Sequence, residues 1–388
     1  MNRELIIIAS IVFVTSLFTR SVDPVVPLIA DGLVVQVGTA ALLSTAFALP
    51  YALIQPVLGA LGDMMSKTKL MSISLVVLVL SAAVSATAPN FTILVLSRIA
   101  AGIASGGIFP ISLATIGDRI PVAQRQIAIS RMLAATMCGN LLGASLAGVV
   151  GDIAGWRAVF VVTGLLGLIV TVAALIGFRK VPRETPPGFD LTTIVPNYRA
   201  IFANPHAKVC FGAVFLESLV VFGVFPHMAA MMQEAGEPRA SIAGIVLAGF
   251  GIGAVVYTIV VRFLLATLGE RRLMFGGGLI MAAFLLILTL RLPWPLEFAN
   301  FAMMGFGFYW LHGSIQVFAT ELAPQARGSA MALHSMAFFL GQAAGPVIYG
   351  AGFVIVGKTP LLITGAVIIA LVGFVCSRKL RRAPAQPV

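Results

Sequence analysis

The chain has 388 residues, of which 59% are hydrophobic and only 10% are charged. A soluble domain carries about 25% charged residues, so this composition excludes a water-soluble protein and predicts an integral membrane protein. The net charge of +11 raises the alternative of a nucleic-acid partner, but the cations lie scattered between apolar blocks and do not cluster on one soluble face. The three cysteines lack paired spacing, so we expect neither a disulfide framework nor a zinc site, and no cofactor.

Apolar blocks long enough to cross a bilayer, which needs about 20 residues, recur along the whole chain. They predict twelve transmembrane helices at residues 5–28, 40–61, 70–88, 91–116, 127–150, 159–178, 209–231, 242–265, 273–290, 298–319, 330–356 and 361–376. The longest polar stretch, residues 179–208, is rich in proline and charge, which is typical of a linker. The prediction is an all-α membrane protein with an N-terminal six-helix bundle (1–178), a cytoplasmic linker (179–208) and a C-terminal six-helix bundle (209–388).

The two halves of the chain repeat one another. Four residues of the first half have identical counterparts 202 positions later, the pairs being Arg125 and Arg327, Gly139 and Gly341, Gly143 and Gly345, and Gly148 and Gly350. Consecutive matches at one offset, within corresponding apolar blocks, indicate an internal duplication. Two similar bundles related by a pseudo-two-fold axis are typical of secondary transporters.

The cations are distributed unequally between the two sides of the predicted membrane. If the amino terminus is cytoplasmic, 19 of the 25 Lys and Arg residues fall on the cytoplasmic side and 4 on the other, while Arg20 and Arg98 lie within spans. This bias follows the positive-inside rule and predicts that both termini are cytoplasmic. It accounts for the basic charge without a nucleic-acid partner, and it fits a bacterial-type inner membrane.

Three short motifs in the first half carry a resemblance to a known family. Residues 59–69 read GALGDMMSKTK, residues 98–106 read RIAAGIASG, and residues 139–148 read GNLLGASLAG. They resemble, in that order, the loop signature, the arginine motif of proton-coupled members and the glycine-rich antiporter motif of the major facilitator superfamily. Met64, Ser66 and Ala144 depart from the family pattern. A second glycine motif at residues 341–350 and a degenerate loop signature at residues 262–272 extend the resemblance over nearly the whole chain.

The resemblance implies proton-coupled export of drugs or metabolites by rocker-switch alternating access. It also implies that Asp63 locks the two halves together when the cavity faces outward. The glycines of the fifth and eleventh spans allow close helix approach, either as seams on which the halves rock or as ordinary packing. The residues expected to act in gating are Gly59, Asp63, Lys67, Arg125, Gly139, Gly143, Gly148, Arg327, Gly341, Gly345 and Pro346.

Ionisable residues inside spans are costly in lipid and are functional candidates for that reason. Glu217 lies near the middle of the seventh span among apolar neighbours, where desolvation favours the protonated form. We expect it to carry a proton during transport, with a structural acid bonded to a neighbouring helix as the alternative.

Asp23 and Arg20 lie toward the outer part of the first span, and their spacing from Ser16 predicts one shared helix face. Asp23 pairs with either Arg20 or Arg98. Protonation of Asp23 would free an arginine for substrate; the alternative is a permanent ion pair. Pro24 and Pro27 predict a bend at this end of the span.

A central cavity is expected to hold the substrate. Its candidate lining residues are Arg20, Tyr51, Gln55, Phe109, Phe225, Tyr309, Trp310 and His312. For His312 the alternative is a hydrogen bond between helices, and for the aromatic residues it is ordinary packing. No phosphate-binding loop of an ATP-driven motor is encoded, and no nucleophile has a partnered base, so the chain is not expected to be an enzyme.

The sequence therefore favours a secondary active transporter that exports small organic molecules by proton antiport. A symporter or uniporter for uptake of a small organic acid or sugar is the first alternative, and a non-transporting membrane sensor or lipid-handling protein is the second. The expected partners are a small-molecule substrate, protons and the lipid bilayer, with no nucleic acid, and the chain is expected to act as a monomer.

Overall fold

The computed structural model describes residues 3–64, 66–120, 122–179, 194–323 and 327–380. Within these ranges the regular structure is entirely helical, which confirms the all-α prediction. The helices of the first half are α1 (Arg3–Arg20), η1 (Asp23–Val25), α2 (Val26–Leu33), α3 (Val37–Met64), α4 (Lys67–Ala86), α5 (Phe91–Gly106), α6 (Ile108–Arg119) and α7 (Val122–Phe178). Those that follow are α8 (Ile194–Ala203), α9 (Ala207–Phe222), α10 (Phe225–Glu234), α11 (Ala240–Leu288), α12 (Trp294–Glu321), α13 (Arg327–Ile355) and α14 (Lys358–Lys379).

The described residues contain nine helical segments that are long and apolar enough to cross a membrane. Two of them, 131–178 and 240–288, are 48 and 49 residues long. Each contains a glycine with positive φ, Gly155 at 79° in α7 and Gly269 at 73° in α11, where the helical dihedrals are interrupted. Glycine adopts such dihedrals without a steric penalty because it has no Cβ. The twelve predicted spans stay a prediction. The nine segments would amount to twelve spans if each of the two long helices crossed the membrane twice and α12 crossed it once.

The bend expected in the first span is confirmed. The α-helix ends at Arg20, and Asp23 begins a short 3₁₀ helix that contains Pro24. The prediction of one continuous helical face through Ser16, Arg20 and Asp23 is therefore wrong, because proline lacks the N–H that would continue the helix and its ring clashes with the preceding turn. The seventh span is interrupted in the corresponding place, between α9 and α10, and Pro226 lies in the first turn of α10.

The internal repeat extends to packing between helices. A Cβ on Gly143 would lie 2.5 Å from the carbonyl oxygen of Leu17, and one on Gly345 would lie 2.6 Å from that of Leu219. Leu17 and Leu219 are themselves 202 residues apart. Gly139 and Gly341 make the same kind of close approach, to the carbonyl oxygens of Phe13 and Phe215. These four glycines therefore pack α7 on α1 and α13 on α9, each within its own half of the chain.

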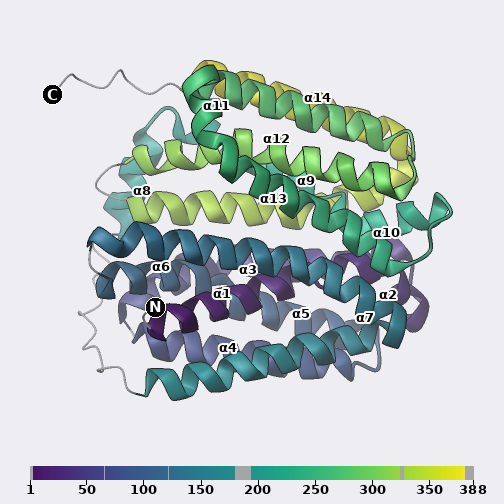
Figure 1. Ribbon diagram of the computed structural model, residues 1–388, viewed down its shortest axis with the longest axis horizontal. Coiled ribbons are helices and arrows are strands. Elements are labelled where there is room, and N and C mark those ends of the chain that lie inside the picture. The colour runs from purple at the N-terminus through teal and green to yellow at the C-terminus, as the bar shows by residue number, and fades with distance from the viewer. Residues whose placement is uncertain (1–2, 65, 121, 180–193, 324–326, 381–388) are drawn as a thin grey trace.

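Contact between the two halves involves a different glycine, Gly148. Its α-carbon lies so close to the backbone of Ala240 that a Cβ would overlap the Ala240 carbonyl group. Figure 1 shows the start of α1 and the end of α14 at one end of the bundle, whereas α2 and α10 lie at the opposite end. We call this opposite end, with residues 22–40, 150–157 and 225–241, the distal end. Gly148 and Ala240 join the halves close to it.

We predict that Gly345→Ala lowers the thermal stability of the purified protein. Alanine in a helix is normally favoured over glycine by about 0.5–1 kcal/mol, but here the added Cβ would meet backbone atoms of Leu219 and Gly223. Overpacking of this kind costs about 1–3 kcal/mol. The matched control is Gly212→Ala in α9, where no atom lies within 4 Å of the added Cβ. A Gly345→Ala protein that melts at or above the temperature of the control contradicts the packing argument.

Candidate functional site

A buried charge cluster lies in the first half of the chain, around Asp23. One carboxylate oxygen accepts a hydrogen bond from the Ser44 hydroxyl at 2.7 Å, and the other pairs with Arg20 at 3.5 Å. Asp23 is 1% exposed and Arg20 is 9% exposed. Of the two pairings that the sequence leaves open, the direct one joins Asp23 to Arg20.

Arg98 of α5 lies in the same half, and no carboxylate of the described residues forms an ion pair with it. Its guanidinium donates two long hydrogen bonds of 3.4 Å to the carbonyl oxygen of Phe18 and stacks 4.5 Å from the ring of Phe47. Arg98 is 1% exposed, and its Nε has no hydrogen-bond partner among the described residues. The cluster therefore buries two arginines against one aspartate.

Arg20 reaches from the first half into the second. Its guanidinium carbon lies 4.4 Å from the ring centre of Phe222 and 4.8 Å from that of Phe225. In the amide orientation that satisfies its surroundings, Gln342 of α13 accepts hydrogen bonds of 3.0 and 3.1 Å from the same guanidinium. A desolvated cation over an aromatic face is stabilised by about 2 kcal/mol. Arg20 thus ties the two halves together through both polar and aromatic contacts.

A second buried site lies in the other half, around Glu217 of α9. Its Oε2 lies 3.2 Å from Nδ1 of His312 on α12. The Glu217 side chain is fully buried, whereas 11% of the His312 side chain stays exposed. The sequence indicates both residues separately. It gives no signal for their pairing, because 95 positions separate them and only the packing of α9 on α12 joins them.

Further polar groups without hydrogen-bond partners surround this pair. His334 of α13 has its ring centre 5.1 Å from that of His312. Among the described residues, the second carboxylate oxygen of Glu217, the hydroxyl of Ser218 and Nε2 of His334 are buried and have no hydrogen-bond partner. Buried polar groups are nearly always paired, and exceptions of this kind are found at functional sites.

Aromatic side chains connect the Arg20 and Glu217 sites. The Phe222 ring, which stacks on Arg20, lies 5.4 Å from the rings of both Phe308 and Phe338. Phe308 in turn stacks on His312 with ring centres 4.8 Å apart. Rings in contact therefore connect Arg20 to His312 through Phe222 and Phe308.

The remaining predicted cavity residues are found in different surroundings. Tyr51 packs across the two halves, with its ring centre 3.8 Å from that of Phe339. The ring centre of Tyr309 lies 6.5 Å from that of His312, and Tyr309 is only partly buried. Trp310 instead packs against α11, where its indole blocks the space beside Gly276. Phe109 and Gln55 lie in the first half, Phe109 against the apolar core around Ile108 and Gln55 buried in α3.

The predicted gating residues are only partly described. The side chains of Asp63, Arg125 and Arg327, and the surroundings of Gly59, fall outside the described part of the structure. Lys67 begins α4 and is half-buried. Pro346 lies inside α13, and its carbonyl oxygen accepts a hydrogen bond of 3.1 Å from Nε2 of His227.

The halves are also held together at the distal end by a helix cap that sequence reasoning missed. The carboxylate of Asp152 in α7 accepts hydrogen bonds of 2.8 Å from the backbone N–H groups of both Ala240 and Ser241, at the start of α11. An acidic side chain at a helix N-terminus satisfies unpaired donors and complements the helix dipole. Nearer the middle, Thr45 donates a hydrogen bond of 2.7 Å to the carbonyl oxygen of Ala343.

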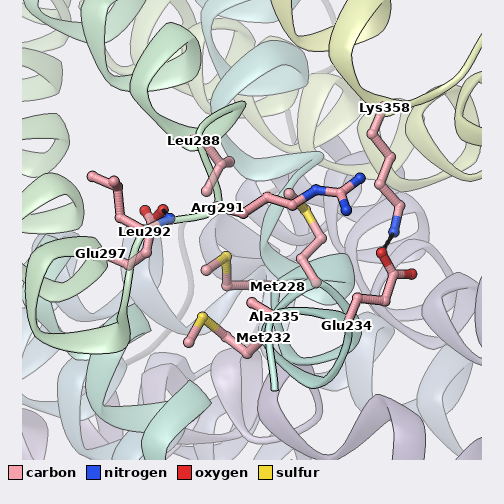
Figure 2. Close-up of a pocket in the computed structure, with 10 residues that line it drawn as sticks. Met228, Met232, Glu234, Ala235, Leu288, Arg291, Leu292, Glu297 and Lys358 are labelled. Atoms are coloured by element: carbon pink, nitrogen blue, oxygen red, sulfur yellow. Dashed lines mark hydrogen bonds and ion pairs between the residues drawn. The ribbon is translucent and has the colours of Figure 1, made fainter. Parts of the chain in front are cut away.

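A pocket at the distal end of the second half is separate from both sites. Figure 2 shows methionine side chains on one side of it and an ion pair between Glu234 and Lys358, which joins α10 to α14. Arg291, which has a left-handed φ of 53°, extends along the pocket toward Lys358. None of the charged groups of the Arg20 or Glu217 site lines this pocket.

Comparison with known proteins identifies the family. Residues 8–238 and 210–388 both match the profile of the Major Facilitator Superfamily, so the chain belongs to that superfamily. It is 25% identical over 388 residues to the quinolone resistance protein NorA of Staphylococcus aureus, covering 99% of this chain and 98% of NorA. It is also 25% identical over 347 residues to the MFS-type transporter YceJ of Bacillus subtilis (strain 168), covering 88% of this chain and 87% of YceJ.

Solved structures show the same fold. A bacterial homologue of the lysosomal transporter Spinster superposes with a TM-score of 0.74 at 17% identity, covering 98% of each chain. The POT family transporter PepTSo superposes with a TM-score of 0.78 at 14% identity, covering 97% of each chain. Together with its apolar helices, these findings make the chain a multi-pass membrane transporter.

Proposed function

We propose that this transporter exports small organic molecules, drugs or metabolites, across a bacterial-type inner membrane in exchange for protons. The observation that carries the proposal is the Glu217–His312 pair. In it, a fully buried carboxyl group of a membrane transporter is hydrogen-bonded to an imidazole of another helix. Intramembrane carboxyl and imidazole groups are the usual carriers of coupled protons. The similarity to NorA, a quinolone resistance protein, supports drug export as the direction and substrate class.

The transport cycle follows from how the two halves touch. The Asp152 cap on α11 joins them at the distal end, and the Arg20 contact with Gln342 ties them deeper in the bundle. The excess of cations on the side of the termini supports a distal end that faces outward. In this proposal the present conformation is closed to the outside, and a rocker-switch motion breaks these contacts to release substrate. The glycine contacts within each half persist, so each half moves as one body.

Everted membrane vesicles test this proposal. Acidification of the lumen by respiration is expected to drive uptake of a fluorescent organic cation such as ethidium well above that of vesicles that lack the protein, because uptake against a gradient requires coupling to the proton gradient. A protonophore should remove the uptake. Uptake that survives the protonophore, or accumulation of the same compounds by intact cells, contradicts proton-driven export.

A second candidate is uptake of a small organic anion held by Arg98 or Arg20. It is favoured by one observation, the buried Nε of Arg98 that has no hydrogen-bond partner among the described residues. Arginine binds carboxylates through paired N–H donors, so an anionic substrate would satisfy this group. Accumulation of a labelled carboxylate by intact cells, abolished by Arg98→Gln, distinguishes this activity from export.

A further inference from the structure

Glu217 is buried away from solvent, so a proton that it carries needs a path to water. Its side chain is fully buried, and one of its two carboxylate oxygens has no hydrogen-bond partner among the described residues. Protons move between groups that are within hydrogen-bond reach, directly or through one water. A proton held on Glu217 therefore has to leave through the group bonded to the other oxygen, and that group is His312.

His312 is placed to make this connection. Nδ1 of its ring lies 3.2 Å from Oε2 of Glu217, while 11% of the His312 side chain remains exposed. The ring is held between Phe308, which stacks on it, and Phe338, whose ring centre is 5.2 Å away. Aromatic packing of this kind restrains the ring in the orientation that keeps Nδ1 at Glu217, and the hydrogen bond at Nδ1 leaves Nε2 as the second nitrogen that can exchange a proton.

The other titratable groups around the pair lack a bond to Glu217. His334 approaches from α13 and Tyr309 from α12; both make ring contacts with His312, and neither has a hydrogen bond to Glu217 among the described residues. Cys210 of α9 directs its thiol to the carbonyl oxygen of Ile315, and Cys376 of α14 is buried. Arg20, the nearest buried cation from the other half, is separated from His312 by the Phe222 and Phe308 rings. Among the described residues, His312 alone is bonded to Glu217 and also partly exposed.

We propose that His312 is the proton relay between Glu217 and the solvent-exposed interior of the transporter, an inference that rests on the proposed proton antiport. In the release step, a neutral ring carrying its hydrogen on Nε2 accepts the Glu217 proton at Nδ1 and gives its Nε2 proton to water. The products are a Glu217 carboxylate, a neutral imidazole with its hydrogen on Nδ1, and one hydronium ion. Uptake of a proton is the same sequence in reverse.

The test is His312→Asn in proteoliposomes that contain a trapped pH dye. The asparagine amide takes the place of Nδ1 and keeps a hydrogen bond to Glu217, but it neither gains nor loses a proton near neutral pH. Substrate-dependent proton flux should fall by at least about 100-fold, the lower part of the effect expected for loss of an acid–base group. Exchange of ethidium for ethidium at alkaline pH moves no net proton, so it reports folding and substrate binding separately, and the variant should lose proton flux to a much greater extent than it loses exchange.

His334→Asn is the matched control, since it removes a neighbouring buried imidazole that has no hydrogen bond to Glu217 among the described residues. It should leave both activities within twofold. His312→Glu restores a titratable group and should recover proton flux. This recovery would show that the loss in His312→Asn comes from the missing titratable group and not from poor folding. Unchanged proton flux in His312→Asn, or an equal loss in His334→Asn, overturns the relay. A wild type that carries ethidium in net transport with no substrate-dependent proton flux overturns the proposed antiport instead.

Discussion

Glu217→Gln is expected to abolish proton-driven export while leaving substrate exchange intact. Glutamine has the size of the glutamic acid and can still bond Nδ1 of His312, so the packing of α9 on α12 is preserved. It cannot bind or release a proton, so the step that couples transport to the proton gradient is lost. We expect the rate of proton-driven ethidium uptake into everted vesicles to fall by about 100-fold or more.

The control for this variant is Glu237→Gln. Glu237 is an acid of the loop between α10 and α11, and its carboxylate pairs with Arg239. Hydrogen bonding to Arg239 lowers the pKa of Glu237, so this carboxylate is ionised at neutral pH and takes no part in proton uptake. Its variant should transport like the wild type. If Glu217→Gln still concentrates ethidium in an energised vesicle, Glu217 is a structural acid, the alternative that the sequence leaves open.

Asp23→Asn is expected to destabilise the protein severely. Asp23 is the carboxylate that faces Arg20, and Arg98 lies in the same buried cluster. Removing one partner of a buried ion pair leaves an uncompensated charge and costs about 3–5 kcal/mol. The melting temperature of the purified protein should fall, and part of the loss should return in the double variant Arg20→Gln with Asp23→Asn, because the two changes act on one interaction.

Asp31→Asn, at an exposed acid of α2, is the matched control and should melt like the wild type. The measurement also separates the two interpretations of this cluster. A permanent ion pair predicts that Asp23→Asn loses stability and transport together. A protein that stays stable but no longer transports indicates instead that Asp23 binds and releases a proton during the cycle. Full stability with full transport contradicts both.

The sequence repeat also relates the Arg20 site to its own aromatic contacts. Arg20 and Asp23 occupy the positions that Phe222 and Phe225 occupy 202 residues later. In the structure these counterparts are in contact, since the Arg20 guanidinium stacks on both phenylalanine rings. These positions, equivalent by the 202-residue offset, therefore meet in the structure, with an ion pair on one side of the contact and two aromatic rings on the other.

Several features of the protein were determined by the sequence alone. Long apolar blocks predicted an all-helical membrane protein, since backbone groups in lipid must be satisfied within each segment. The repeat was visible because identical residues recur at one offset, and the structure extends it to the carbonyl groups of Leu17 and Leu219. Glu217, Asp23, Arg20 and Arg98 stood out because an ionisable group in an apolar span is conspicuous, and all four are buried.

Only the tertiary structure decided which groups meet. Helical periodicity assigns a residue to a face of its own helix, but it does not say which neighbouring helix that face contacts. For this reason the pairing of Glu217 with His312, the choice of Arg20 over Arg98 as the direct partner of Asp23, and the cap of Asp152 on α11 could not be predicted. The glycines could not be assigned to partner helices for the same reason. Their spacing predicts that another helix approaches closely, but only the packing of the helices decides which helix that is. Gly143 and Gly345 pack within their own halves, and Gly148 packs between them.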